Sequence, residues 1–143
     1  MNEPRCQPAG QCPASRRRWW SWQVLPALLD AAAILVVGSL RTAPPGAEHF
    51  SDKTLHCIAF AIFAWLAARA LRFLRPSWPV ARVLLAGFLA SSALGGGLEL
   101  WQGLLPYRDC EFLDFVADGI GAAIAMLITG GAWHLLRSRA PAP

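Results

Sequence analysis

Apolar residues gather in four long stretches, which shorter polar or charged segments separate. The stretches cover residues 20–40, 54–74, 79–98 and 112–136. A helix of about 20 residues crosses the roughly 30 Å hydrocarbon core of a bilayer, so each stretch is long enough to span it. Helix is favoured because backbone groups in lipid must be bonded within their own segment. The pattern predicts an all-α, polytopic membrane protein with a four-helix transmembrane bundle.

The composition fits this class of protein. Of the 143 residues, 55% are hydrophobic and only 15% are charged, whereas a soluble domain carries about 25% charged residues. We expect one membrane domain over residues 19–137, a flexible basic tail before it (1–18) and a C-terminal tail after it (138–143). A cleaved signal peptide is the alternative for the first stretch. That stretch is longer than the hydrophobic region of a typical signal peptide, however, and no convincing small-residue cleavage site ends it.

Basic residues are distributed unevenly between the two sides of the predicted bundle. All but three of the 13 lie in the N-terminal tail, around the second connection or at the C-terminus; the exceptions are Arg41, Lys53 and Arg108. Cytoplasmic segments carry the excess of Lys and Arg, so we expect both termini in the cytoplasm. The arginines flank apolar stretches and form no single polar face, which argues against nucleic-acid binding despite the net charge of +4.

Acidic residues show the opposite bias, which membrane topology does not require. Seven of the nine fall on the outer side or just inside it, namely Glu48, Asp52, Glu99, Asp109, Glu111, Asp114 and Asp118. Charged residues at membrane depth are rare and usually functional. The polar groups that contain these residues are therefore the candidate site.

Two of these groups lie at the start of the second stretch and the end of the third. Asp52 and His56 are four residues apart and share a helix face, with Lys53 beside them. Glu99 and Gln102 share a face after three glycines that permit close helix contact. The alternatives are a helix cap with interfacial side chains for the first group and a flexible helix end for the second.

The third group leads into the fourth stretch. Arg108 comes first, and Asp114 and Asp118 then share one face with Gly121. Asp118 falls about two turns inside the stretch, where an ionised carboxylate facing lipid would cost several kcal/mol. It must face the bundle, be paired or be protonated. The alternative is a buried structural ion pair with Arg108 or Lys53.

Asp30 stands apart from these groups, in the middle of the first stretch. Ser91 and Ser92 should lie at a similar depth in the third stretch. We expect Asp30 to be structural or protonated, and these hydroxyls are candidate hydrogen-bond partners for its carboxyl group. Among the cysteines, Cys57 lies in an apolar stretch, and Cys110 lies on the outer side with no obvious disulfide partner.

In this order and at these spacings, the three groups resemble the motifs of the VanZ-like family of small bacterial membrane proteins. The family pattern is DK-xx-H, then E-xx-Q, then an Arg, then D-xxx-N-xx-G. The matching residues are Asp52, Lys53, His56, Glu99, Gln102, Arg108, Asp114, Asp118 and Gly121. Asp118 stands where the family commonly has Asn, and Cys57 stands where an aromatic residue is frequent. The resemblance implies a multi-pass protein of the bacterial inner (cytoplasmic) membrane with a role in the cell envelope; the family's namesake is linked to teicoplanin-type glycopeptide resistance.

The leading functional hypothesis is a site for an anionic lipid or a polyprenyl-linked envelope precursor at the outer face. Arg108 offers a planar fork to phosphate or carboxylate, and Lys53 adds a second cation. The expected ligand-binding residues are Asp52, Lys53, His56, Glu99, Gln102, Arg108, Asp114 and Asp118. Candidate catalytic groups are His56, Glu99 and Asp114, because a histidine beside carboxylates can move protons; no nucleophilic Ser or Cys accompanies them.

Other chemistries and functions stay open. One histidine with scattered carboxylates is weak for zinc, and we predict no metal site and no cofactor, although Glu99, Asp114 and Asp118 offer oxygen ligands suited to magnesium or calcium. The protein could instead be a non-catalytic scaffold for an envelope protein partner. It could also be a small proton-coupled carrier with Glu99 and Asp118 as relay groups, although no internal repeat supports a carrier.

Overall fold

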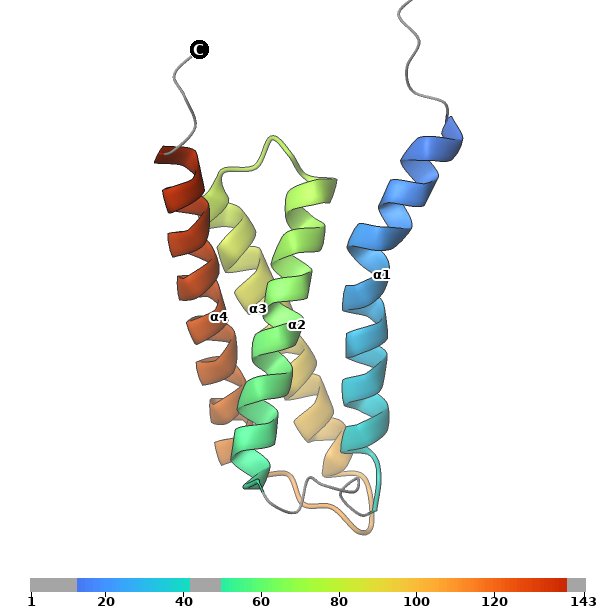
Figure 1. The fold of residues 1–143 in the computed structure, drawn as a ribbon. Helices are drawn as coiled ribbons and strands as arrows, with labels where there is room; N and C mark the ends of the chain where they lie inside the picture. The colour runs from blue at the N-terminus through green and yellow to red at the C-terminus, as the bar shows by residue number, and fades with distance from the viewer. Residues whose placement is uncertain (1–12, 42–49, 139–143) are drawn as a thin grey trace, which may run out of the picture.

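The chain is all-α, as the sequence predicts. A computed structural model describes residues 13–41 and 50–138. Four helices follow one another along the chain (Figure 1). They are α1 (Pro13–Gly38), α2 (Asp52–Leu74), α3 (Val80–Gln102) and α4 (Phe112–Ser138).

Three of the helices are long and apolar enough to cross a membrane, namely α2, α3 and α4. The apolar part of α1 is shorter and covers Trp22–Gly38. The sequence predicts a flexible tail up to residue 18, whereas α1 already begins at Pro13, so its first turns include the basic run 16–18. Residues 1–12 and 139–143 of the predicted tails lie outside the described residues.

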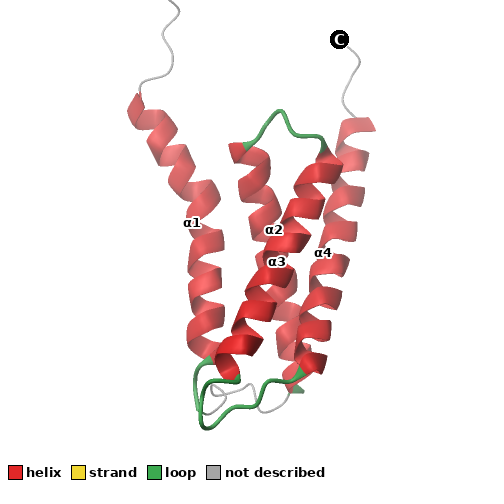
Figure 2. Ribbon diagram, turned by 180° about the vertical axis from the view of Figure 1, so that it is seen from behind, coloured by secondary structure: helices red, strands yellow, loops and turns green. Residues whose placement is uncertain are grey.

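The helices run up and down alongside one another. Helices α2, α3 and α4 pack together, and α1 stands at one edge, where it packs mainly against α2 (Figures 1 and 2). The start of α1, the end of α4 and the α2–α3 connection lie at the same end of the bundle. The α3–α4 connection and the starts of α2 and α4 lie at the opposite end, which we call the polar end.

Large apolar side chains face outward, in contrast to the surface of a soluble protein. Leu28, Leu29, Leu127 and Ile128 are each more than half exposed. Many other leucines, isoleucines and valines along all four helices are exposed as well. A surface of this kind is compatible with a lipid bilayer as the surroundings.

Small residues fill the interior of the bundle. The largest buried cluster contains Ala64, Ala68 and Ala122 together with Val83 and Met126. Lipid chains are as apolar as the helices, so burial of apolar surface does not drive helix association in a membrane. Small residues instead let helix backbones approach closely and gain dispersion energy.

Two glycines bring the helices closest at the polar end. A Cβ atom added at Gly121 of α4 would overlap the backbone carbonyl of Cys57 in α2. A Cβ atom added at Gly95 of α3 would lie 2.5 Å from Asp118 Oδ2 in α4. These two contacts join α4 to both of its neighbours, next to His56 on one side and one turn from Glu99 on the other.

The C-terminal end of α1 is held by side chains from the end of α3 and the connection after it. Gln102 Nε2 donates to Gly38 O at 2.9 Å, and Tyr107 Oη donates to Ser39 O at 3.1 Å. Arg108 Nε donates to Leu40 O at 3.2 Å. The last carbonyls of a helix have no partner within it, so these bonds satisfy groups that would otherwise need water.

The close contact at Gly121 makes a stability prediction. Gly121→Ala should lower the free energy of unfolding by about 1–3 kcal/mol, because α2 and α4 must move apart to admit the methyl group. Chemical unfolding of the detergent-solubilised protein, followed by circular dichroism, measures the change.

Gly119→Ala is the matched control on the same helix. No heavy atom lies within 4 Å of a Cβ added there, and alanine favours helix over glycine by about 1 kcal/mol. Equal losses of stability in both variants would contradict the proposed close contact at Gly121.

Candidate functional site

Charged side chains from three helices meet inside the polar end of the bundle. Helix α2 contributes Lys53 and His56, α3 contributes Glu99, and α4 contributes Asp114 and Asp118. We call these five residues the polar core. All three acidic members are buried, with Asp118 fully enclosed. The expectation that Asp118 must face the bundle, be paired or be protonated agrees with its position.

Lys53 neutralises the outer part of the polar core. Its Nζ atom lies 2.9 Å from Asp114 Oδ1 and 3.0 Å from Glu111 Oε2. Lys53 lies in the first turn of α2, whose N-terminus is capped by Ser51 Oγ, which accepts a hydrogen bond from the backbone N–H of Thr54. The cap fixes the position of Lys53, and two carboxylates share its charge.

His56 connects the carboxylates of α4. Its Nδ1 atom lies 2.9 Å from Asp118 Oδ1, and its Nε2 atom lies 3.9 Å from Asp114 Oδ2. The ring also stacks on Phe60 one turn later, with 6.2 Å between ring centroids. The imidazole is thus fixed in position with a carboxylate beyond each nitrogen, an arrangement that can hold or move a proton.

Glu99 closes the polar core from α3. Its Oε2 atom accepts a hydrogen bond of 2.9 Å from the backbone N–H of Glu111. Its other oxygen, Oε1, is buried without a hydrogen-bond partner in the described part of the chain, and so is Asp118 Oδ2. Buried polar atoms are nearly always satisfied, so two unpartnered carboxylate oxygens at one site require an explanation.

Two groups of three residues bring potential metal-ligand atoms within 4.8 Å of one another. One consists of Asp52, His56 and Asp114, and the other of His56, Glu99 and Asp118. Sequence spacing did not reveal either group, because each combines residues from two or three helices.

A cleft of about 370 Å³ opens beside the polar core, between α1 and α2. Its polar lining includes Asp30, Asp52, His56, Gln102 and Arg108. Apolar side chains of α1, α2 and α3 form the rest of the wall, among them Ile34, Val37, Ile58, Phe60, Ile62 and Leu98. Most of the cleft wall is therefore apolar, and Asp52, His56, Gln102 and Arg108 form its polar end. Asp30 adds one carboxyl group to the wall, about two helical turns before Gly38 on α1.

The structure divides the predicted site residues between the polar core and the cleft. Asp52, Gln102 and Arg108 line the cleft, and His56 belongs to both. Lys53 and Arg108, expected to bind one anion together, have separate partners: Lys53 pairs with carboxylates, and Arg108 donates to the carbonyl of Leu40, just after α1. The alternative ion pair of Asp118 with Arg108 or Lys53 is wrong, because Asp118 contacts His56 and Lys53 pairs with Asp114.

Some residues of the site were missed or misplaced by sequence reasoning. Glu111 was missed: its side chain pairs with Lys53, and its backbone N–H donates to Glu99. Its position three residues before Asp114, just before α4 begins, was the feature of the sequence that could have indicated this. The expected Asp30–serine contact is wrong for Ser91, whose hydroxyl donates to Phe60 O at 3.2 Å. Asp30 Oδ2 has no partner among the described residues and faces the cleft region.

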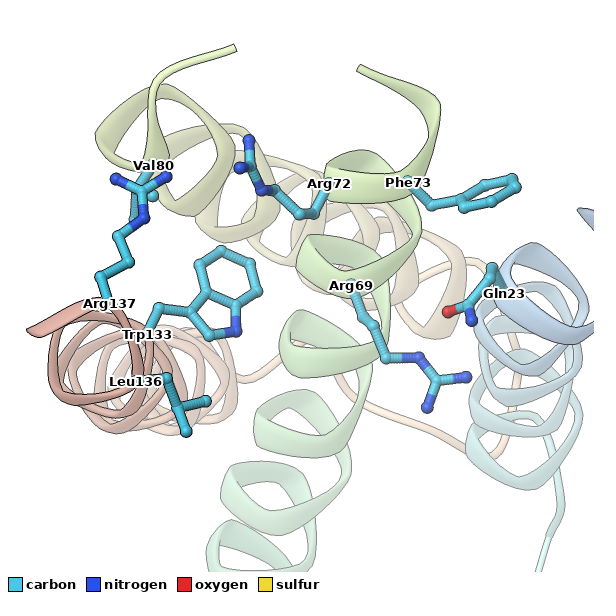
Figure 3. Close-up of a pocket in the computed structure, with 8 residues that line it drawn as sticks. All are labelled: Gln23, Arg69, Arg72, Phe73, Val80, Trp133, Leu136 and Arg137. Carbon is cyan, nitrogen blue, oxygen red and sulfur yellow. The ribbon is translucent and has the colours of Figure 1, made fainter. Parts of the chain in front are cut away.

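A second cavity, of about 430 Å³, lies at the opposite end of the bundle. Figure 3 shows its lining, with Arg69 and Arg72 on α2, Arg137 on α4 and Gln23 on α1. Arg69 donates to Trp22 O, and Arg72 donates to the carbonyls of Pro76 and Trp78. Among the described residues, none that lines this cavity is acidic, so the described linings of the two cavities differ in charge.

No protein-family model, curated protein or solved structure matches the chain. The likeness to VanZ-like proteins therefore depends on the motif residues alone.

Lys53 should stabilise the fold chiefly through Asp114. Lys53→Met leaves the buried Asp114 carboxylate without its cation, so the midpoint of thermal unfolding in detergent should fall. Adding Asp114→Asn to Lys53→Met removes the stranded charge and should restore part of the loss.

Glu111→Gln in the same Lys53→Met background is the control for this prediction. The Glu111 side chain is 56% exposed, against 7% for Asp114. Water can therefore solvate its charge, and the second substitution should restore little. Equal recovery from both second substitutions would show that burial of Asp114 is not the cause.

Proposed function

We propose that this chain is an integral membrane protein of four spans whose cleft binds a phosphate-bearing, anionic lipid at the outer face of the membrane. The single observation that supports this proposal is the shape of the cleft, an apolar wall leading to a polar end with Arg108. A lipid has the same distribution of chemistry, with an acyl or prenyl chain beside a charged head group.

Arg108 is the group that binds the head group in this proposal. Among the described residues, Arg108 donates through its Nε atom to the carbonyl of Leu40, and in this proposal its other guanidinium N–H groups bind a phosphate oxygen. A guanidinium can bind two oxygens of a phosphate side by side. Lys53 is less suited, because Asp114 and Glu111 already balance its charge.

The four-span topology requires α1 to cross the membrane as well. Its apolar part, Trp22–Gly38, extends about 26 Å, close to the roughly 30 Å of hydrocarbon in a bilayer. The arginines of the basic run 16–18 precede this part and suit the membrane interface. Basic residues favour the cytoplasm on the side of the two termini and the α2–α3 connection. The polar end, with the cleft, then faces the outside.

The VanZ-like motifs suggest the context of this binding. In that context the ligand is an envelope lipid or a polyprenyl-linked precursor in the bacterial inner membrane, and its binding is linked to glycopeptide resistance. A non-catalytic scaffold is the competing function, and loss of bound lipid without loss of folding separates the two.

Arg108→Gln should remove bound anionic lipid while preserving the fold. The amide can still donate to Leu40 O, but the positive charge is lost. Native mass spectrometry of protein purified in mild detergent, after addition of phosphatidylglycerol, should show at least about tenfold less of the one-lipid complex, since a charged hydrogen bond is worth about 1.5–3 kcal/mol.

Arg137→Gln is the control of equal charge, located in the arginine-lined cavity at the other end. It should retain the phosphatidylglycerol complex. Loss of lipid in Arg137→Gln with retention in Arg108→Gln would overturn the assignment to the outer cleft, and retention in both variants would favour the scaffold.

The proposed topology predicts which cysteines are reachable from outside the cell. Cys110 lies exposed in the α3–α4 connection at the polar end. A membrane-impermeant maleimide applied to intact spheroplasts should label Cys110 in a variant that lacks the other cysteines. A variant with Cys12 alone should be labelled only after permeabilisation, and the reverse pattern would invert the topology.

A further inference from the structure

We propose that His56, Glu99 and Asp118 form a binding site for a divalent metal ion of the zinc or manganese type. The three residues come from α2, α3 and α4, so the ion would bind where all three helices meet. This site shares His56 with the lipid cleft, but its test measures metal binding and does not depend on lipid binding.

The donor atoms are already close enough to share one ion with little movement. One ligand atom from each residue lies within 4.8 Å of the other two. Two ligands of one zinc ion lie about 3–4 Å apart, since each bond is about 2 Å long. His56 Nδ1 and Asp118 Oδ1 are 2.9 Å apart, so these two atoms need to separate only slightly to share one ion, with Glu99 as the third ligand.

Two buried oxygens lack hydrogen-bond partners at this point. Glu99 is 4% exposed and Asp118 is fully buried, and Glu99 Oε1 and Asp118 Oδ2 are unpartnered among the described residues. Asp118 Oδ2 faces α3 at Gly95, one turn before Glu99 on the same helix. An ion between the helices would satisfy oxygens that no donor reaches.

Charge balance also favours a divalent cation. Lys53 compensates Asp114, with the exposed Glu111 at the surface. Glu99 and Asp118 together carry two negative charges when ionised, and a neutral His56 carries none. Isolated buried charge is costly, and one divalent ion brings this trio to neutrality while each ligand keeps the protonation state that metals require.

The alternative trio, Asp52, His56 and Asp114, is less suited to a metal. Asp52 is exposed, and Asp114 already has a cation in Lys53 at 2.9 Å. Lys53 already balances one carboxylate of that trio, and water can solvate the other, so a metal ion is needed less there.

The surroundings of the trio match those of known metal ligands. A ligating histidine usually presents its second nitrogen to a carboxylate that orients the ring. His56 Nε2 faces Asp114 Oδ2 at 3.9 Å, and Lys53 fixes Asp114 in turn. The second oxygen of Glu99 is held by the backbone N–H of Glu111. Asp114 therefore helps to position His56, and Glu111 helps to position Glu99.

The donor set selects the class of ion. One imidazole nitrogen and two carboxylate oxygens suit zinc, manganese or ferrous iron. Calcium prefers six to eight oxygen ligands, and magnesium keeps several waters around oxygen donors. Three protein ligands also leave a coordination position for water or substrate, as catalytic zinc sites do.

Metal binding to the full-length protein in detergent tests the proposal directly. After treatment with a chelator and its removal, zinc or manganese is added and measured by mass spectrometry of the element and by titration calorimetry. We expect one ion per chain. Glu99→Gln and Asp118→Asn should each weaken binding at least about tenfold, since even residues that only orient ligands change affinity by 10–100-fold.

Asp52→Asn is the matched control and should bind as the wild type does. An equal loss in Asp52→Asn would move the ion to the other trio, and unchanged binding in Glu99→Gln and Asp118→Asn would overturn the proposal. Absence of stoichiometric binding by the wild type would also overturn it.

A second measurement covers the case in which the ligand variants fail to fold. The sequence has three histidines, at positions 49, 56 and 134. The double variant His49→Gln, His134→Gln leaves His56 as the sole imidazole. Its copper complex should show nitrogen coupling from one imidazole by electron paramagnetic resonance, and the absence of that coupling would refute the site.

Discussion

The contact between His56 and Asp118 is the constraint on which the rest of the polar end depends. A carboxylate with no exposed surface must be paired inside the bundle, because lipid offers no solvation. Its partner must come from a neighbouring helix at hydrogen-bond distance, which requires very close backbones. Gly121 against Cys57 and Gly95 against Asp118 allow that approach. Small residues and buried charge are therefore two parts of one arrangement.

His56 belongs to both proposed sites, the lipid cleft and the metal site. It belongs to the polar core through Asp118 and lines the cleft beside Asp52 and Arg108. A ligand in the cleft would lie next to a ring whose other contacts are buried carboxylates. Binding in the cleft and the charge state of the core can therefore influence each other through one side chain.

The helices could be predicted from the sequence because lipid imposes a simple rule on length and polarity. The stretches that became α2 and α4 were located to within two residues, whereas α3 continues four residues past its predicted end, as far as Gln102. The start of α1 could not be predicted, because the helix continues through the basic run 16–18, and a basic run outside the membrane can be helical or not.

Spacing placed Asp114 and Asp118 on one helix face, but it could not show which cation would pair with each carboxylate. Lys53 and Arg108 look alike in sequence, and only the packing of α1 against the α3–α4 connection directs them to different partners.

The bonds that hold the end of α1 have a consequence for the order of biosynthesis. The carbonyls of Gly38, Ser39 and Leu40 receive donors that follow 64–68 residues later in the chain. A ribosome makes α1 first, but the residues that fasten it emerge only after α3 is complete. Until then the first helix has α2 as its only neighbour, and the cleft lacks Gln102 and Arg108. The polar end of the cleft is therefore among the last features to be completed, and a nascent chain truncated before residue 102 would contain most of the apolar wall but neither Gln102 nor Arg108.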